Sequence, residues 1–350
     1  LYAESSPTWN ARDLLIERCR RIGAPLLMVS PSPSLHAVEW HVPVRPPRAR
    51  ERAGWPIVEV IDRSETEPWK RSLVTSDLIR HLRDPERTVV CVSNTTGRAR
   101  VLACRSCREL ARCERCDAAV GLTDDGRLRC ARCQLERPAV CSNCGSSDFA
   151  NLRPGVTRLR EELEAAAGRP AVLVTGVSDE VTPAAGVYVG TEAVLHRVPA
   201  ADTVAFLDID RELLAPRYPA DEQAMALFVR AARVVGPRSL GGRLLLQTFM
   251  PHHRVIQAAL LADPGRLVDE ERARRSMLGL PPFGSIAEVS GPGAAAYAHS
   301  LPAQPSVLRS EVEPGDSLLR ADSADLLGDL LAQGVRPACQ RLRDADDAAR

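Results

Sequence analysis

The sequence predicts an α/β protein whose parallel sheet is interrupted by a cysteine-rich module and followed by a small α+β C-terminal region. Three observations lead to this fold class. Short apolar runs alternate with helical patterns, which is typical of parallel strands covered on both faces. Eight of the eleven cysteines fall between Cys104 and Cys144. The residues after 281 are rich in Ala, Pro and Asp and are only weakly patterned.

The periodicity of apolar residues places the individual elements. Strands are expected at 26–29, 57–61, 88–92, 171–175, 187–189, 203–209, 243–249 and 285–290. Helices are expected at 10–21, 34–41, 76–82, 156–167, 220–235, 252–262, 265–278 and 322–333. Cys91 lies inside one of these strands and is expected in the core. The last residues, 340–350, are expected to be frayed.

The segment 43–56 separates the first elements from the rest of the sheet. It contains four prolines and four arginines. This composition favours an extended, solvated linker. A strap of arginines that contacts phosphates is the alternative.

The eight clustered cysteines form four Cys-x-x-Cys pairs, and two such pairs supply one closed four-thiolate zinc site. The pairs are Cys104 and Cys107, Cys113 and Cys116, Cys130 and Cys133, and Cys141 and Cys144. Two structural zinc ions are therefore predicted, and metal binding is expected to supply most of the folding energy of this module. A disulfide framework would require an oxidising compartment, and cluster ligands usually have less regular spacing. The spacing alone leaves sequential, alternate and nested pairing open.

Motifs that carry catalysis are missing from the sequence. It contains no G-x-x-x-x-G-K-[ST] phosphate loop and no G-x-S-x-G elbow. Asp208 and Asp210 follow a predicted strand at its carboxyl end, where α/β proteins place their sites, but capping of the next turn is favoured over metal or ribose binding. His252 and His253 open a predicted helix and are also expected to cap it. No catalytic residue is assigned.

The composition bounds the location and partners of the protein. The net charge of +1 gives no global attraction to nucleic acid, and no signal peptide or long apolar run is present, so a cytoplasmic protein without a membrane anchor is predicted. Arginines near the cysteines form a local basic patch that favours DNA contact, with solvated surface charge as the alternative: Arg98, Arg100, Arg105, Arg108, Arg112 and Arg115. The chain starts within a predicted structural unit at Leu1, which suggests a piece of a longer protein.

The cysteine segment between a strand and a helix resembles that of the PriA family (primosomal protein N′), the replication-restart helicases. The resemblance covers about residues 1–300 and includes several motifs outside the cysteines. These are Val29–Leu35, Gly155–Leu163, Val187–Thr191, Leu207–Asp210, Leu246–Thr248 and Leu280–Phe283.

The resemblance implies a domain layout and a function. Residues 1–42 would end a first helicase lobe, 57–101 and 151–280 would form a second, RecA-like lobe, 102–150 would form the zinc module, and 281–350 a small C-terminal domain with a partly disordered tail. It implies nested pairing, with Cys104, Cys107, Cys141 and Cys144 in one site and Cys113, Cys116, Cys130 and Cys133 in the other. The implied partners are forked or branched DNA, primosome proteins and single-strand-binding protein, contacted by a nucleoid-associated monomer. Arg105, Arg108, Arg112 and Arg115 are the candidate DNA contacts.

Departures from the family pattern indicate that the motor is inactive. The motif III turn stands as Ser30-Pro31-Ser32, and the motif V stretch after Thr191 is shortened. The two arginines of motif VI are replaced by Val234 and Pro237, which cannot stabilise the charge of a phosphoryl group in transfer. The leading hypothesis is a fork-binding restart protein without ATPase activity. The alternatives are an ATP-dependent 3′-5′ helicase completed by an upstream region, and a zinc-stabilised scaffold for protein docking without DNA contact.

Overall fold

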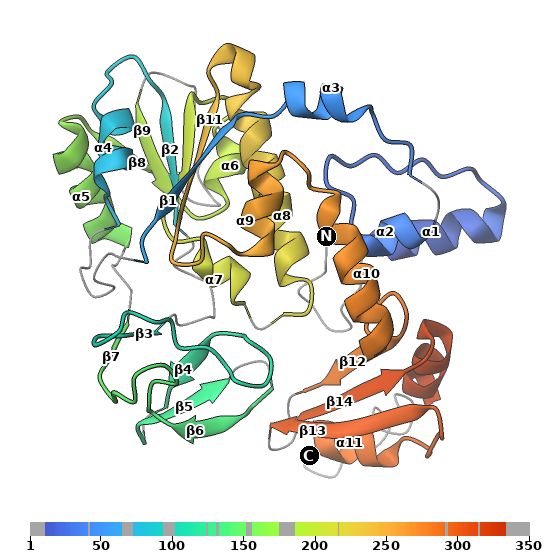
Figure 1. The fold of residues 1–350 in the computed structure, drawn as a ribbon. Coiled ribbons are helices and arrows are strands. Elements are labelled where there is room, and N and C mark those ends of the chain that lie inside the picture. Colours follow the sequence, from blue (N-terminus) through green and yellow to red (C-terminus); the bar gives the residue numbers. More distant parts are fainter. Residues whose placement is uncertain are drawn as a thin grey trace, which may run out of the picture.

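A six-stranded, fully parallel sheet forms the centre of the protein (Figure 1). The computed structural model describes residues 11–40, 43–64, 73–93, 102–123, 125–130, 133–151, 156–174, 186–215, 217–290, 293–313 and 316–333. In spatial order the strands are β1 (Ile57–Asp62), β11 (Arg243–Thr248), β10 (Thr203–Phe206), β2 (Val89–Val92), β9 (Val187–Gly190) and β8 (Ala171–Val174). This layout is the predicted α/β architecture of a RecA-like lobe.

Helices cover both faces of the sheet, which explains why its inner strands are mostly apolar on both faces. Helices α4 (Ser76–Leu82) and α5 (Val156–Ala167) cover one face with buried leucines, among them Leu78 and Leu163. Helices α8 (Ala220–Val235) and α9 (Arg254–Leu260) cover the other face around Phe228 and Ile256. Cys91 is fully buried in the first of these cores, as predicted.

Two expectations for the N-terminal part are wrong. Residues 26–29 form no strand, and Leu27 and Val29 are 87% and 86% exposed. The apolar run suggested burial, but no strand of the described chain lies beside it to pair with. The segment 43–56 is not extended throughout, because α3 (Arg48–Ala53) forms after Pro47. Proline is tolerated at a helix start because the first amides have no intrahelical acceptor.

The cysteine-rich module is inserted between β2 and α5 and lies at the carboxyl ends of the sheet strands (Figure 1). It contains two small antiparallel sheets. One pairs β3 (Leu102–Cys104) with β7 (Phe149–Asn151), and the other contains β4 (Val120–Leu122), β5 (Arg127–Cys130) and β6 (Glu136–Pro138). The predicted patch arginines Arg98 and Arg100 and the frayed end 340–350 lie outside the described residues.

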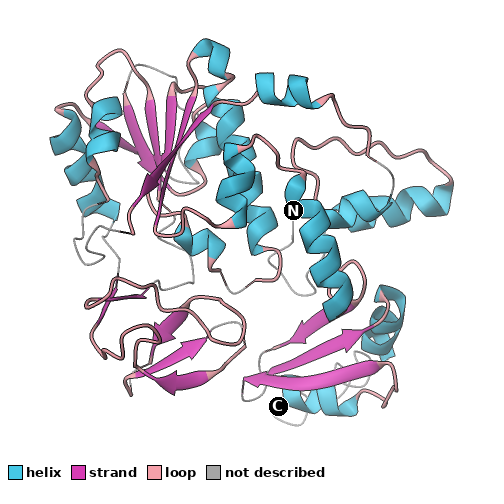
Figure 2. Cartoon of the chain, in the orientation of Figure 1, coloured by secondary structure: helices cyan, strands magenta, loops and turns pink. Residues whose placement is uncertain are grey.

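The C-terminal unit is a three-stranded antiparallel sheet in the order β12, β14, β13, with helices beside it (Figure 2). Its elements are β12 (Ser285–Val289), α11 (Ala294–Ser300), β13 (Val307–Glu313), β14 (Asp316–Ala321) and a helix at 324–333. Helix α10 (Arg266–Leu278) connects it to the central lobe. The α+β character expected for this region is therefore present.

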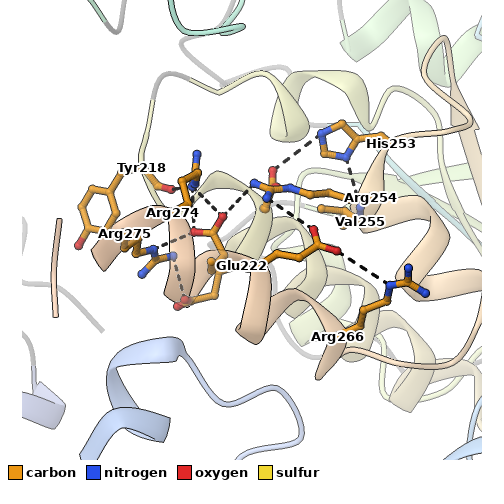
Figure 3. Close-up of polar contacts among 11 residues, drawn as sticks. Tyr218, Glu222, His253, Arg254, Val255, Arg266, Arg274 and Arg275 are labelled. Atoms are coloured by element: carbon orange, nitrogen blue, oxygen red, sulfur yellow. Dashed lines mark hydrogen bonds and ion pairs between the residues drawn. The ribbon is translucent and has the colours of Figure 1, made fainter. Parts of the chain in front are cut away.

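A buried ion network fixes α10 against α8, α9 and the N-terminal segment (Figure 3). The Glu271 carboxylate accepts hydrogen bonds of 2.8 Å from Arg254, Arg274 and Arg275. Arg275 also donates to Glu222, which accepts the backbone amide of Leu35 across 3.1 Å at the start of α2 (Leu35–Trp40). Helix α2 is therefore tied to the lobe through Glu222, and α1 (Ala11–Ile22) contacts the residue before α2 through a 2.7 Å hydrogen bond from Arg12 to the Ser34 hydroxyl.

Candidate metal centre

All four Cys-x-x-Cys pairs fold into the same small turn. In each turn the amide of the residue after the second cysteine donates to the carbonyl of the first cysteine, at 2.9–3.0 Å. The amide of the first cysteine donates to the carbonyl five residues later, at 2.8–3.0 Å. Because these bonds close each turn locally, the two sulfurs of a pair point to the same side.

The residue after the second cysteine has a positive φ in every turn. These residues are Arg108 (70°), Asp117 (58°), Gln134 (57°) and Gly145 (76°). Left-handed backbone costs a non-glycine residue about 1–2 kcal/mol. Three of the four turns have a non-glycine residue at this position, which indicates that the position of the cysteines constrains the backbone there.

Strand register brings the turns together in nested pairs. The β3–β7 pairing sets Cys104 opposite Phe149, so the first turn meets the fourth. The β4–β5 hairpin sets Val120 opposite Cys130, so the second turn meets the third. We call the group of Cys104, Cys107, Cys141 and Cys144 the outer centre, and the group of Cys113, Cys116, Cys130 and Cys133 the inner centre. These are the groups that the family resemblance implied.

The sulfur geometry of both centres fits a tetrahedral metal ion. In each centre the four sulfurs lie within 4.8 Å of one another, and cross-turn Sγ–Sγ separations are 3.4–3.5 Å. Zinc–sulfur bonds of about 2.3 Å imply tetrahedral edges of about 3.8 Å. The separations far exceed the ~2.05 Å of a disulfide bond. Four soft thiolates suit zinc, among a few thiophilic metals.

Electrostatics inside each centre also favour a cation. Burial raises the pKa of Cys104, but the backbone amides of Cys107 and Ser106 outweigh this and lower that pKa to about 6. The Ser146 amide lowers the pKa of Cys144, yet the neighbouring sulfurs, Cys107 first, raise it to about 12. Four sulfurs at this spacing cannot all be thiolates without a cation between them. A divalent metal ion would remove this conflict.

The two centres differ in exposure. The inner centre lies in a small apolar cluster with Leu102, Val120 and Leu128, and none of its cysteines is exposed. In the outer centre Cys144 is exposed and Cys107 is partly exposed. The module therefore has an apolar core of its own, although the sequence suggested little material for one.

The module attaches to the lobe beside α7 (Asp210–Leu213). The Ala119 amide donates to the Leu214 carbonyl across 3.0 Å. Ala103, Leu110 and Ala119 belong to the same apolar cluster as Leu213 and Leu214 of the lobe. Sequence patterns gave no signal for these contacts, because they depend on how the module is oriented.

Asp208 and Asp210 anchor α7 and are not free to bind a ligand. Asp208 forms an ion pair of 2.5 Å with Arg211, and Asp210 accepts hydrogen bonds from the Thr248 hydroxyl and from the Phe249 amide, the latter at 2.9 Å. Burial, and then the Asp208 charge, raise the pKa of Asp210 to about 7.

The predicted capping role for His253 is confirmed, since its Nδ1 accepts the Val255 amide at the start of α9.

Comparison with curated proteins finds similar bacterial proteins that share one name. A Mycobacterium leprae protein named "Probable replication restart protein PriA" is 32% identical over 248 residues, which cover 67% of this chain and 35% of that protein. The replication restart protein PriA of Haemophilus influenzae is 23% identical over 305 residues, 80% of this chain and 42% of that protein. The PriA of Bacillus subtilis is 25% identical over 316 residues, 82% and 39%.

The chain belongs to the PriA family. It spans 35% to 42% of the length of these three relatives. A scan against protein-family models gives no match. Within the described segments, no helix is both long and apolar enough to cross a membrane.

The positions that carry motif VI arginines in the PriA resemblance hold no cation here. Val234 is buried in the last turn of α8, and its carbonyl accepts the Ala201 amide at 3.1 Å. Pro237 precedes the short 3₁₀ helix η1 (Arg238–Leu240). Arg233 and Arg238 flank these positions and are exposed.

The four arginines that we predicted as DNA contacts of this PriA-family module differ in their ion pairs and backbone conformation. Arg105 pairs with Asp148 at 3.2 Å, and Arg112 with Asp117 at 3.5 Å. Arg108 occupies a left-handed turn position. Arg115 is exposed and forms no ion pair within the described part of the chain.

Proposed function

We propose that this chain acts in replication restart, binding branched DNA at stalled forks and supporting primosome assembly. The observation that carries the proposal is the pair of nested four-cysteine centres mounted at the carboxyl end of a PriA-family lobe. Such a module, which shares an apolar core with the lobe beside α7, is suited to present a fixed surface to a junction or to a partner protein.

Both centres would hold zinc. The outer centre would use Cys104, Cys107, Cys141 and Cys144, and the inner centre Cys113, Cys116, Cys130 and Cys133. Four thiolates leave no position for a reacting group, so the metal supplies folding energy and not catalysis. The backbone amides of Cys107 and Ser106 lower the pKa of Cys104, which favours the thiolate form that a metal ion binds.

The protein would act without ATP hydrolysis. Val234 and Pro237 stand where the family resemblance places phosphate-binding arginines, and neither can neutralise a transferring phosphoryl group. This favours a scaffold over the alternative of an ATP-driven helicase completed by an upstream region. A monomer bound to forks would be associated with the nucleoid in the cytoplasm.

Arg105, Arg108, Arg112 and Arg115 would provide the DNA contacts of the module. Arg115 is the strongest of them because no carboxylate competes for it in the described chain. Contacts of this kind position a protein on the phosphate backbone.

A second candidate function, protein docking without DNA contact, is favoured by the charge of the module. Residues 102–151 carry eight arginines and seven carboxylates. Each zinc ion with four thiolates has a net charge of about −2, so the loaded module would be negative overall. A negative module attracts DNA poorly except at local arginines.

Fluorescence anisotropy with labelled forked DNA and matched duplex distinguishes these functions. The restart function predicts tighter binding to the fork and loss of that preference when zinc is removed by a chelator. Binding of neither DNA at moderate salt would reject fork recognition and favour the docking scaffold. DNA-stimulated ATP hydrolysis by the purified chain would reject the proposed loss of motor activity.

A further inference from the structure

We propose that the outer centre is a site of reversible thiol oxidation, at which a peroxide converts Cys104 and Cys144 to a disulfide and releases the metal. The inner centre keeps its metal under the same conditions. The inference rests on the zinc assignment proposed above but not on DNA binding. Its class of reactant is a small peroxide such as hydrogen peroxide.

Exposure makes the outer centre the reactive one. Cys144 is exposed, whereas no inner cysteine is more than partly exposed. The inner sulfurs are also shielded by the cluster of Leu102, Val120 and Leu128. A peroxide must reach a sulfur atom to react with it, and susceptibility follows access and thiolate character.

Cys104 is a cross-turn neighbour of Cys144 within the outer centre. Its sulfur lies 3.5 Å from the sulfur of Cys104. The β3–β7 pairing holds their two turns together, reinforced by a 2.9 Å hydrogen bond between the Ser106 and Ser146 hydroxyls. The sulfurs must approach by only about 1.5 Å to form the bond.

The reaction balances with one peroxide molecule. With zinc bound, Cys144 would be a thiolate, and its exposed sulfur would attack a peroxide oxygen, form a sulfenic acid and expel hydroxide. The Cys104 thiolate then attacks the Cys144 sulfur and expels a second hydroxide. The two sulfurs lose two electrons in total, and the hydroxides take up two protons to become water. A zinc ion held there would keep only Cys107 and Cys141 as ligands and would be released. A dithiol reductant with added zinc reverses the change.

Oxidation would act first on the outer half of the module. The outer turns lie at the ends of β3 and β7, and Ala103 and Leu110 beside the first turn share the apolar cluster of the lobe, while the hydrogen bond from Ala119 to Leu214 lies in the inner half. The released thiols of Cys107 and Cys141 would leave their turns without a metal to fix them. The outer surface therefore changes shape while the inner centre and the lobe stay folded.

The test uses the whole chain with Cys19→Ser and Cys339→Ser, which leaves the eight module cysteines and the buried Cys91. The zinc-loaded protein is treated with hydrogen peroxide, zinc release is followed with a chelating dye, and disulfides are mapped by non-reducing peptide mass spectrometry. We expect one of the two zinc ions to leave roughly tenfold faster than the other. We also expect a Cys104–Cys144 linkage, with recovery of zinc after dithiothreitol. Loss of both ions together, or first disulfides among the inner cysteines, would overturn the proposal.

Matched histidine variants keep four ligands in each centre, since Cys₃His sites also hold zinc. Cys144→His should retain zinc and abolish the rapid release, whereas Cys116→His in the inner centre should leave it unchanged. Cadmium-113 NMR of the unmutated chain gives a readout that needs no variant: peroxide should remove one resonance and spare the other. A protein isolated without zinc would reject both this proposal and the zinc assignment, but not the fork-binding function.

Discussion

The backbone amide of Ala119 donates a hydrogen bond to the carbonyl of Leu214. This bond joins the cysteine-rich module to the lobe at the end of α7. Leu214 is 2% exposed and belongs to a core that both parts share. The orientation of the module is therefore set in part by residues of the lobe.

Leu214→Ala should destabilise the protein and loosen the module. Removing a buried leucine side chain costs about 2–5 kcal/mol, depending on how far the site collapses. Denaturant unfolding would measure the loss. Leu240→Ala, at a leucine that is 80% exposed, is the control and should change stability by less than about 0.5 kcal/mol. Equal effects of the two substitutions would contradict the shared core.

Gly145→Ala should destabilise the module by about 1 kcal/mol, because Gly145 has a φ of 76° and alanine adopts that conformation poorly. Thermal unfolding of the zinc-loaded chain would show the change. The control is Gly121→Ala, at a strand glycine without positive φ and with no heavy atom within 4 Å of an added Cβ. A variant as stable as the parent would show that the turn does not require its left-handed residue.

Glu271→Gln should cost about 3–5 kcal/mol, since it removes the charge that the buried Arg275 shares with the partly exposed Arg254 and Arg274. Glu271 is 2% exposed and pairs with Arg254, Arg274 and Arg275. Glu270→Gln is the matched control, because that carboxylate is 45% exposed and its ion pairs are 3.7–4.0 Å long. The control should lose under about 1 kcal/mol in the same denaturant titration. Similar losses in both variants would mean that the network adds little.

Asp210→Asn should change how stability depends on pH. Burial, and then the Asp208 charge, raise the pKa of Asp210 from 3.8 to about 7. Between these values the folded protein holds a proton that the unfolded chain has lost, so the contribution of Asp210 falls as pH rises. Asparagine cannot ionise, yet it can still pair with Phe249 and Thr248. The variant should match the parent near pH 4 and gain on the order of 4 kcal/mol relative to it above pH 7. Urea unfolding at both pH values tests this, and a pH-independent difference would contradict it.

Arg115→Ala should weaken binding to forked DNA and lower the slope of log affinity against log salt by about one, if one phosphate contact is lost. Anisotropy titrations at several salt concentrations give both numbers. Arg18→Ala is the control, because Arg18 is also exposed but lies on α1. An unchanged slope for the Arg115 variant would remove it from the proposed DNA contacts.

The sequence predicted the sheet well because its strands are apolar on both faces and its helices have clear periodicity. Helix α8, for example, begins and ends at the predicted residues 220 and 235. Residues 26–29 have the same apolar pattern as a strand, but a strand also needs a neighbour, and a local pattern cannot report one. Helix α3 was missed because the prolines outweighed the helix-forming Arg48–Ala53 in the interpretation.

The eight cysteines were visible in the sequence, but the residues that shape their turns were not. The left-handed position is held by Arg, Asp, Gln and Gly in turn, so only Gly145 carried a compositional signal. Spacing could not choose between pairings, because the choice depends on the register of β3 with β7 and of β4 with β5. The attachment of Ala119 to Leu214 joins residues far apart in the chain, which a pattern of nearby residues does not reveal.

Nested pairing implies an order of assembly. The loop between Cys113 and Cys133 is about half as long as the loop between Cys104 and Cys144. Closing the shorter loop therefore costs about 0.6 kcal/mol less in chain entropy. Once the inner turns hold a metal, the outer turns are already close, so the second ion binds a partly prepared site. The inner centre at the β4–β5 hairpin should therefore fold before the outer centre, and unfolding should follow the reverse order. The inner centre is then the first to form and the last to be lost.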